Sequence, residues 1–223
     1  LRQHRLDDGP PGGAQVRADL ANAESRAAKL AAKLAALPAN VHVFDGRGGK
    51  VQLHGTDIWI HGVSFRDRHA PDSLLDKFSA PVADAINIGM LHSSLAGADG
   101  HDTYAPCSVA DLQTMGFDYW ALGHIHKRRV YSDAPWIVMP GIPQGRDIGE
   151  AGPQSATMLE IQDGTISLRE VPTAAVIFQS VTLDIGPFTN DELLRKALGQ
   201  LVQSQAKPDN TSILRLSLIG QSD

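Results

Sequence analysis

The chain has 223 residues, of which 42% are hydrophobic and 20% are charged, so it is long enough and apolar enough to fold around a core. Its 20 basic and 25 acidic side chains give a formal net charge of -5. This balance excludes nucleic-acid binding through overall charge and leaves a local patch or metal-bound phosphate as the contact. A single cysteine, Cys107, excludes an internal disulfide and is typical of the cytoplasm, where we expect the protein. No apolar run approaches a membrane span, so we expect no membrane contact.

The first part of the chain predicts an irregular lead-in and then a helix. Residues 1–21 are rich in Arg, Asp, Gly and Pro and show no period. Residues 22–37 predict a helix, because Asn22 is a suitable N-cap and the leucines recur at spacings of four and three. Pro38 ends this helix.

Short strands are predicted next, over 41–44, 51–54 and 57–63, with glycine-containing turns between them. Each of these strands contains a histidine. We interpret all three as packed or surface residues rather than metal ligands: His42, His54 and His61.

Two buried strands in the middle of the chain each lead into a histidine. Residues 86–91 predict a compact apolar strand that ends at His92, and residues 117–122 predict a second one, followed by His124 and His126. Between them, residues 108–115 predict a helix with Ser108 as its N-cap.

The remaining sequence predicts antiparallel strands and then a separate module. The strands cover 128–131, 136–139, 156–161 and 165–171, with Asp163-Gly164 as a hairpin turn. After a boundary at 172–175, strands over 176–185 and 213–218 flank a helix over 191–205, capped by Asn190. Strands that alternate with helices and meanders indicate a mixed α/β sandwich.

Three of the histidines are candidate metal ligands. His92, His124 and His126 all follow strands, at the end where α/β folds place ligand groups. His124 and His126 are one residue apart, so their side chains diverge and can serve two different ions. Neutral imidazole suits zinc, manganese, iron or nickel. Two ions about 3.5–4 Å apart also need a bridging anion, usually a carboxylate, and such a pair hydrolyses phosphate esters.

These motifs resemble the calcineurin-like metallophosphoesterases, and in particular their DNA-repair exonuclease branch (SbcD-like, YhaO-type). The resemblance covers most of the chain from about residue 25. It is carried by Gly123-His124-Ile125-His126, by Leu91-His92-Ser93-Ser94 upstream, by residues 100–107 and 118–127, and by Pro140-Gly141 with Gln144-Gly145-Arg146.

The resemblance implies an α/β fold and a set of roles. Residues 22–174 would form the C-terminal part of an αββα sandwich with mixed sheets, and residues 175–223 the start of a small α/β capping module. His92 and His124 would bind one metal ion and His126 the other, with two divalent ions, most often Mn²⁺, as cofactors. His101 and Asp102 would shape the site from an adjacent loop, or cap that loop, and Arg146 would meet substrate phosphate or belong to a solvated charge cluster. The implied partners are DNA, an SMC-like coiled-coil ATPase subunit and a second copy of the chain in a homodimer.

The sequence departs from the family pattern at its start. It has no Asp-x-His and no Gly-Asp there, and Asp19-Leu20-Ala21-Asn22 stands where the family has Gly-Asn-His-Asp. The bridging carboxylate is therefore missing, and we expect only weak metal binding. Two interpretations follow. Either the chain is the C-terminal portion of an ordinary enzyme of this family, which we prefer, or it is a degenerate member of the family.

Three functions remain open: a DNA exonuclease, a small-molecule phosphodiesterase, and a non-catalytic subunit that binds DNA or an ATPase. The module after Pro172 argues against the small-molecule enzyme, because small-substrate members commonly lack it.

Overall fold

The computed structural model describes residues 25, 32–65, 70–95, 104–206 and 210–221, and the chain divides into two compact units, 1–43 and 44–223. In the first unit, residues 32–35 are helical and the helix stops before Pro38. The expected lead-in over 1–21 and most of the expected helix over 22–37 lie outside the described residues. The strand expected over 41–44 is wrong. The segment is irregular and its valines are exposed, because none of the described strands pairs with it.

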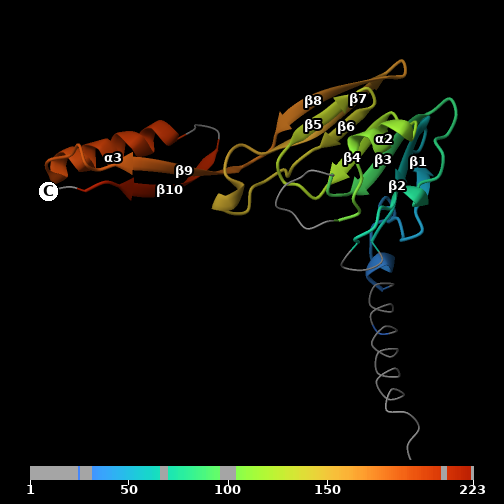
Figure 1. Ribbon diagram of the computed structural model, residues 1–223, viewed down its shortest axis with the longest axis horizontal. Coiled ribbons are helices and arrows are strands. Elements are labelled where there is room, and N and C mark those ends of the chain that lie inside the picture. Colours follow the sequence, from blue (N-terminus) through green and yellow to red (C-terminus); the bar gives the residue numbers. More distant parts are fainter. Residues whose placement is uncertain (1–24, 26–31, 66–69, 96–103, 207–209, 222–223) are drawn as a thin grey trace, which may run out of the picture. The chain divides into compact units, whose positions relative to one another are not determined.

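The second unit is built on a six-stranded mixed sheet with the order β1-β2-β3-β4-β6-β5 (Figure 1). Its strands are β1 (Gly49–Gln52), β2 (Ile58–Gly62), β3 (Ile86–His92), β4 (Tyr119–Gly123), β5 (Arg129–Asp133) and β6 (Trp136–Met139). The inner strands β2, β3, β4 and β6 run parallel, whereas β1 and β5 are antiparallel edge strands. The expected α/β class with a mixed sheet is confirmed, and this sheet is consistent with a metallophosphoesterase-like fold. The four-layer αββα arrangement stays a prediction.

Crossover connections join the parallel strands, as such strands require. The connection from β2 to β3 contains the short 3₁₀ helix η1 (Leu75–Lys77), and the one from β3 to β4 contains α2 (Val109–Thr114). Helix α2 begins with the expected cap: Ser108 accepts a hydrogen bond from the Asp111 amide, and the Asp111 carboxylate accepts one from the Ser108 amide. The helix is held to the sheet where the fully buried Trp120 of β4 donates its indole N–H to the Leu112 carbonyl, at 3.1 Å.

The later elements match the expected segments within one or two residues. β7 (Ser155–Gln162) and β8 (Thr165–Pro172) form an antiparallel hairpin whose turn residues, Asp163 and Gly164, both have positive φ. Trp136 donates its indole N–H to the Ile166 carbonyl and so ties this hairpin to β6. The short 3₁₀ helix η2 (Ile148–Glu150), between β6 and β7, has no counterpart among the expected elements.

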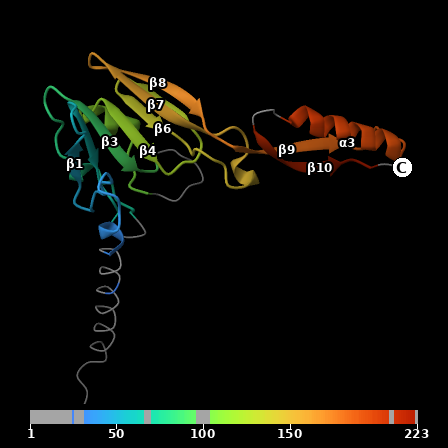
Figure 2. The ribbon, with the colours of Figure 1, turned by 180° about the vertical axis from the view of Figure 1, so that it is seen from behind.

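The C-terminal module is a βαβ unit. β9 (Val176–Asp184) and β10 (Thr211–Ile219) are parallel, and α3 (Asp191–Gln205) lies alongside them in both views (Figures 1 and 2). Asn190 caps α3 as expected, by accepting from the Leu193 amide. Of these three elements, only β9 contributes a buried side chain, that of Ile177.

None of the helices in the described part of the chain is both long and apolar enough to cross a membrane.

The core of the sheet leaves no room for a side chain at Gly89. This residue lies opposite Trp120 in the β3–β4 register, and a Cβ atom at Gly89 would overlap the Trp120 ring. We therefore expect Gly89→Ala to lower the free energy of unfolding by about 1–3 kcal/mol in urea titrations. The matched control is Gly199→Ala on α3, where a Cβ meets nothing within 4 Å. That substitution should raise the free energy of unfolding by roughly 0.5–1 kcal/mol. A fully stable Gly89→Ala protein would contradict this packing.

A buried histidine should make stability depend on pH. His61 of β2 is fully buried, lies 3.0 Å from the Asn87 side-chain oxygen and 3.3 Å from the Ser79 hydroxyl, and packs edge-on to Phe117. Asn87 also accepts from the Val82 amide, so its Oδ1 is an acceptor and His61 donates from Nε2. Burial lowers the pKa of His61 below its usual 6.5, so the folded state holds this ring neutral.

As the pH falls below 6.5, the unfolded chain takes up a proton at His61 that the folded chain excludes, so the free energy of unfolding decreases until the pH passes the lowered folded-state pKa. We expect His61→Gln to remove this contribution, which flattens the pH dependence of the free energy of unfolding below pH 6.5 relative to the wild type. Parallel stability profiles of the two proteins would show that His61 titrates normally.

Candidate metal centre

The candidate centre starts from the register between two parallel strands. β3 ends at His92 and β4 ends at Gly123, and these two residues are Cα partners in the ladder (Figure 2 shows the strands side by side). His124 follows at once. Its backbone has φ 117°, which is unusual for a residue other than glycine and turns the chain sharply at the strand end. The end of β3 and the turn after β4 thus bring two histidines from distant parts of the sequence to one edge of the sheet.

The two imidazoles face each other directly. His124 Nδ1 lies 3.2 Å from His92 Nε2, and the ring planes are nearly perpendicular, at 77°. Two aromatic rings contact the pair, although His92 itself is exposed: the Tyr104 ring lies 5.2 Å from His124 and the Phe65 ring lies 5.5 Å from His92, centroid to centroid. These contacts restrict the rotation of both imidazoles, so the pair is held in place before any ligand arrives.

Gly123 contributes by its lack of a side chain. A Cβ atom at this position would lie 3.1 Å from His92 Nδ1, tighter than an ordinary van der Waals contact. The close approach of the His92 ring therefore favours glycine at this position.

The backbone of Tyr104 is hydrogen-bonded to Ser94, close to His92. Its amide donates to the Ser94 hydroxyl at 3.0 Å, and the Ser94 amide donates to the Tyr104 carbonyl at 2.7 Å. Ser93, fully buried below, donates its hydroxyl to the Ala105 carbonyl. The segment that carries Tyr104 is therefore bonded to the residues that directly follow His92.

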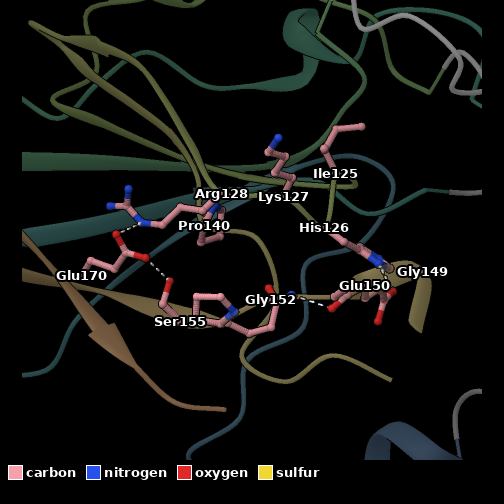
Figure 3. Close-up of a pocket in the computed structure, with 13 residues that line it drawn as sticks. Ile125, His126, Lys127, Arg128, Pro140, Gly149, Glu150, Gly152, Ser155 and Glu170 are labelled. Atoms are coloured by element: carbon pink, nitrogen blue, oxygen red, sulfur yellow. Dashed lines mark hydrogen bonds and ion pairs between the residues drawn. The ribbon is translucent and has the colours of Figure 1, made fainter. Parts of the chain in front are cut away.

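His126 contacts different partners from the His92–His124 pair. Its Nδ1 lies 2.6 Å from the carboxylate of Glu150, the last residue of η2. Figure 3 shows the two side chains pointing toward one another. Arg146 binds the same carboxylate through its guanidinium group and its backbone amide. The Arg146 side chain, helped by its amide and by His126, lowers the pKa of Glu150 to about 2, so this carboxylate is ionised.

A cleft of about 500 Å³ opens beside His126. One wall carries Glu150, and the other carries Glu170, which accepts from the Ser155 hydroxyl at 2.7 Å and pairs with Arg128 at 3.8 Å (Figure 3). Lys127 also lines this space. The cleft thus presents charges of both signs next to a histidine.

The predicted site residues are distributed as follows. His92 and His124 are brought together, whereas His126 is bonded to Glu150 and Arg146. His101 and Asp102 lie outside the described residues. Within the part of the chain that is described, no three side chains of His, Cys, Asp or Glu gather closely enough to hold a metal ion. Glu150 was not expected, because nothing in the sequence connects a carboxylate to a histidine 24 residues earlier.

Sequence comparison relates the chain to one known protein. No family model matches the chain. Over 188 residues it is 31% identical to the uncharacterized metallophosphoesterase YhaO of Bacillus subtilis (strain 168). The chain is a distant homologue of that protein. The alignment covers 82% of this chain and 46% of the relative, so the chain spans about half the length of the metallophosphoesterase it matches.

The histidine pair of this metallophosphoesterase homologue fits a divalent ion. Two nitrogens bound at about 2.1 Å to one ion lie about 3.0 Å apart at a right angle and about 3.4 Å apart at the tetrahedral angle. The observed separation of 3.2 Å falls between these values. Burial, reinforced by repulsion from His124 and His126, lowers the pKa of His92 and favours the neutral imidazole that metals bind. His92 and His124 therefore fit as ligands to one ion.

A double-mutant cycle tests the shared ion. If both rings bind the same ion, His92→Ala and His124→Ala should each reduce Co²⁺ affinity by at least about 10-fold. Mutation of a residue that only supports a metal ligand already costs that much affinity. The double variant should lose little more, because the site is already broken. The control is His54→Ala, an exposed residue in the β1–β2 turn. Additive losses in isothermal titration would show that the two histidines bind different ions.

Proposed function

We propose that this chain carries histidine ligands of a two-metal phosphodiesterase that acts on DNA, an exonuclease of the SbcD-like type. The observation that carries the proposal is the contact between His92 and His124 at the ends of adjacent parallel strands. The homology to a metallophosphoesterase supports the same chemistry. His92 and His124 would hold one ion and His126 the other.

Two bound divalent ions, with Mn²⁺ the best candidate, would polarise a phosphoryl oxygen and lower the pKa of a bound water. The residues of the chain would contribute orientation and charge around them. The aromatic rings of Phe65 and Tyr104 pack against the His92–His124 pair. Lys127 lines the cleft beside His126, where a cation would meet a phosphate. Arg146 is already paired with Glu150, which favours a supporting role over direct phosphate contact.

The substrate and partners belong to the same proposal. DNA as the substrate is supported by the resemblance to the exonuclease branch and by the βαβ module of β9, α3 and β10 that follows Pro172. An SMC-like coiled-coil ATPase, a second copy of the chain and a cytoplasmic location follow from that resemblance.

A second candidate is a non-catalytic subunit that binds DNA or an ATPase. The observation that favours it is the lack of a carboxylate next to the histidine pair within the described residues. Without a bridging anion, two divalent ions repel each other, and catalysis through both of them would fail.

Metal binding and DNA cleavage by the 223-residue chain test the proposal. We expect weak Mn²⁺ binding by calorimetry, lost in His124→Ala, and little cleavage of linear duplex DNA, because the chain begins without the aspartate motifs of the family. Tight two-site binding would contradict the assigned ligands, and cleavage that survives His124→Ala would place the chemistry elsewhere.

The gene upstream of the codon for Leu1 separates the two candidates. An Asp-x-His and a Gly-Asp motif in frame there would support the enzyme, and the longer protein should then cleave linear duplex DNA with Mn²⁺. A start codon at that point would support the binding subunit.

A further inference from the structure

The Glu150 carboxylate forms an unusually well defined contact with His126. The distance from His126 Nδ1 to Glu150 Oε1 is 2.6 Å, which is short for a nitrogen–oxygen hydrogen bond and typical of one assisted by charge. Only 13% of the Glu150 side chain is exposed, against 46% for His126, so the carboxylate is the better buried partner and the imidazole is the more accessible one.

Arg146 holds the carboxylate from the other side. Its Nε lies 3.2 Å from both carboxylate oxygens, its Nη2 binds Oε1, and its backbone amide donates to Oε2 at 2.8 Å. Four interactions from one residue leave Glu150 little freedom to rotate. Arg146 therefore fixes Glu150, and Glu150 in turn fixes His126.

This arrangement determines which ring nitrogen of His126 carries the proton. Arg146 Nη2 also lies 3.1 Å from His126 Nδ1, so Nδ1 has a donor and an acceptor as neighbours. The carboxylate is closer and can only accept, whereas the Arg146 group already donates to Oε1. A lone pair on Nδ1 would face the carboxylate oxygen at 2.6 Å, so the proton belongs on Nδ1 and the lone pair on Nε2.

Histidine ligands in metal sites show this pattern: one ring nitrogen binds the ion, and the other donates to a carboxylate that fixes the ring and its tautomer. We propose that Glu150, held by Arg146, is a positioning residue that presents His126 Nε2 to a divalent ion. This assignment rests on the proposed function, because it gives the second ion of that centre a prepared ligand. It also gives Arg146 a definite role, as the group that fixes Glu150.

Four variants of the full 223-residue chain test the proposal. Glu150→Ala removes the acceptor. Glu150→Gln keeps a carbonyl oxygen for the Nδ1 proton and loses only the charge. Glu170→Ala is the matched control, since Glu170 lies in the same cleft and contacts Ser155 and Arg128 but no histidine. His124→Ala reports on the separate histidine pair.

The first readout is the tautomer of His126 in the metal-free protein, from ¹⁵N chemical shifts of labelled imidazoles. The wild type, Glu150→Gln and Glu170→Ala should carry the proton on Nδ1. Glu150→Ala should shift His126 toward the Nε2–H form that free histidine prefers. A wild-type ring protonated on Nε2, or an unchanged tautomer in Glu150→Ala, would overturn the proposal.

The second readout is Co²⁺ affinity, measured by titration with the metal alone. Glu150→Ala should weaken the site to which His126 contributes by about 10–100-fold, Glu150→Gln should recover part of the loss, and Glu170→Ala should leave the affinity unchanged. A changed tautomer with unchanged affinity would refute the role of Glu150 as the residue that prepares His126 for an ion. If His124→Ala still weakened binding in that case, the proposed function would stand without this inference, and if it did not, both would fail.

Discussion

The candidate centre depends on the pairing of β3 with β4. In this register Leu91 lies beside Leu122 and His92 beside Gly123, so the strand ends coincide and His124 begins the turn next to the His92 ring. A slip by one residue would move every side chain of a strand to the other face of the sheet and separate the two imidazoles. The register is specified by the core beneath it, where Gly89 accommodates the Trp120 ring and that ring is bonded to α2. The packing of Trp120 thus helps to fix the strand register, and this register brings His92 and His124 together.

The two histidine positions have different surroundings. His92 and His124 contact the rings of Tyr104 and Phe65, which limit their motion by packing although His92 is exposed. His126 lies in a polar cleft and is held by an ionised carboxylate. Partial desolvation and the repulsion between neighbouring imidazoles favour the neutral form of His92, and a carboxylate on Nδ1 makes the opposite nitrogen a better donor to a metal. The fold therefore prepares its histidines in two ways, one by packing and one by charge.

Much of the fold could be predicted from local sequence signals. The Ser108 cap with Asp111, the Asn190 cap, the Asp163-Gly164 turn and the apolar strands before His92 and His124 all depend on residues close in the chain, and the structure places them as expected. The strand expected over 41–44 failed because alternating valines favour a strand only when a partner pairs with it. Such pairing is not visible in a local pattern.

The site was predictable only in part, for the same reason. The contact between His92 and His124 follows from two strands that lead into histidines, once those strands are taken as neighbours. Glu150 lies in a short 3₁₀ turn without periodicity, and it meets His126 only through the path of the chain between β6 and β7. The contact between Glu150 and His126 therefore could not be predicted from the spacing of residues in the sequence.

The module of β9, α3 and β10 has a further consequence. It joins two parallel strands and one helix with a single buried side chain, Ile177, while Leu193, Val202 and Ile213 are about half exposed. Parallel sheets are normally covered on both faces by other elements. Segments with few buried apolar contacts unfold locally at a low cost in free energy. Backbone amides of this module should therefore exchange with deuterated solvent well before those of β3 and β4, whose protection reflects unfolding of the whole sheet.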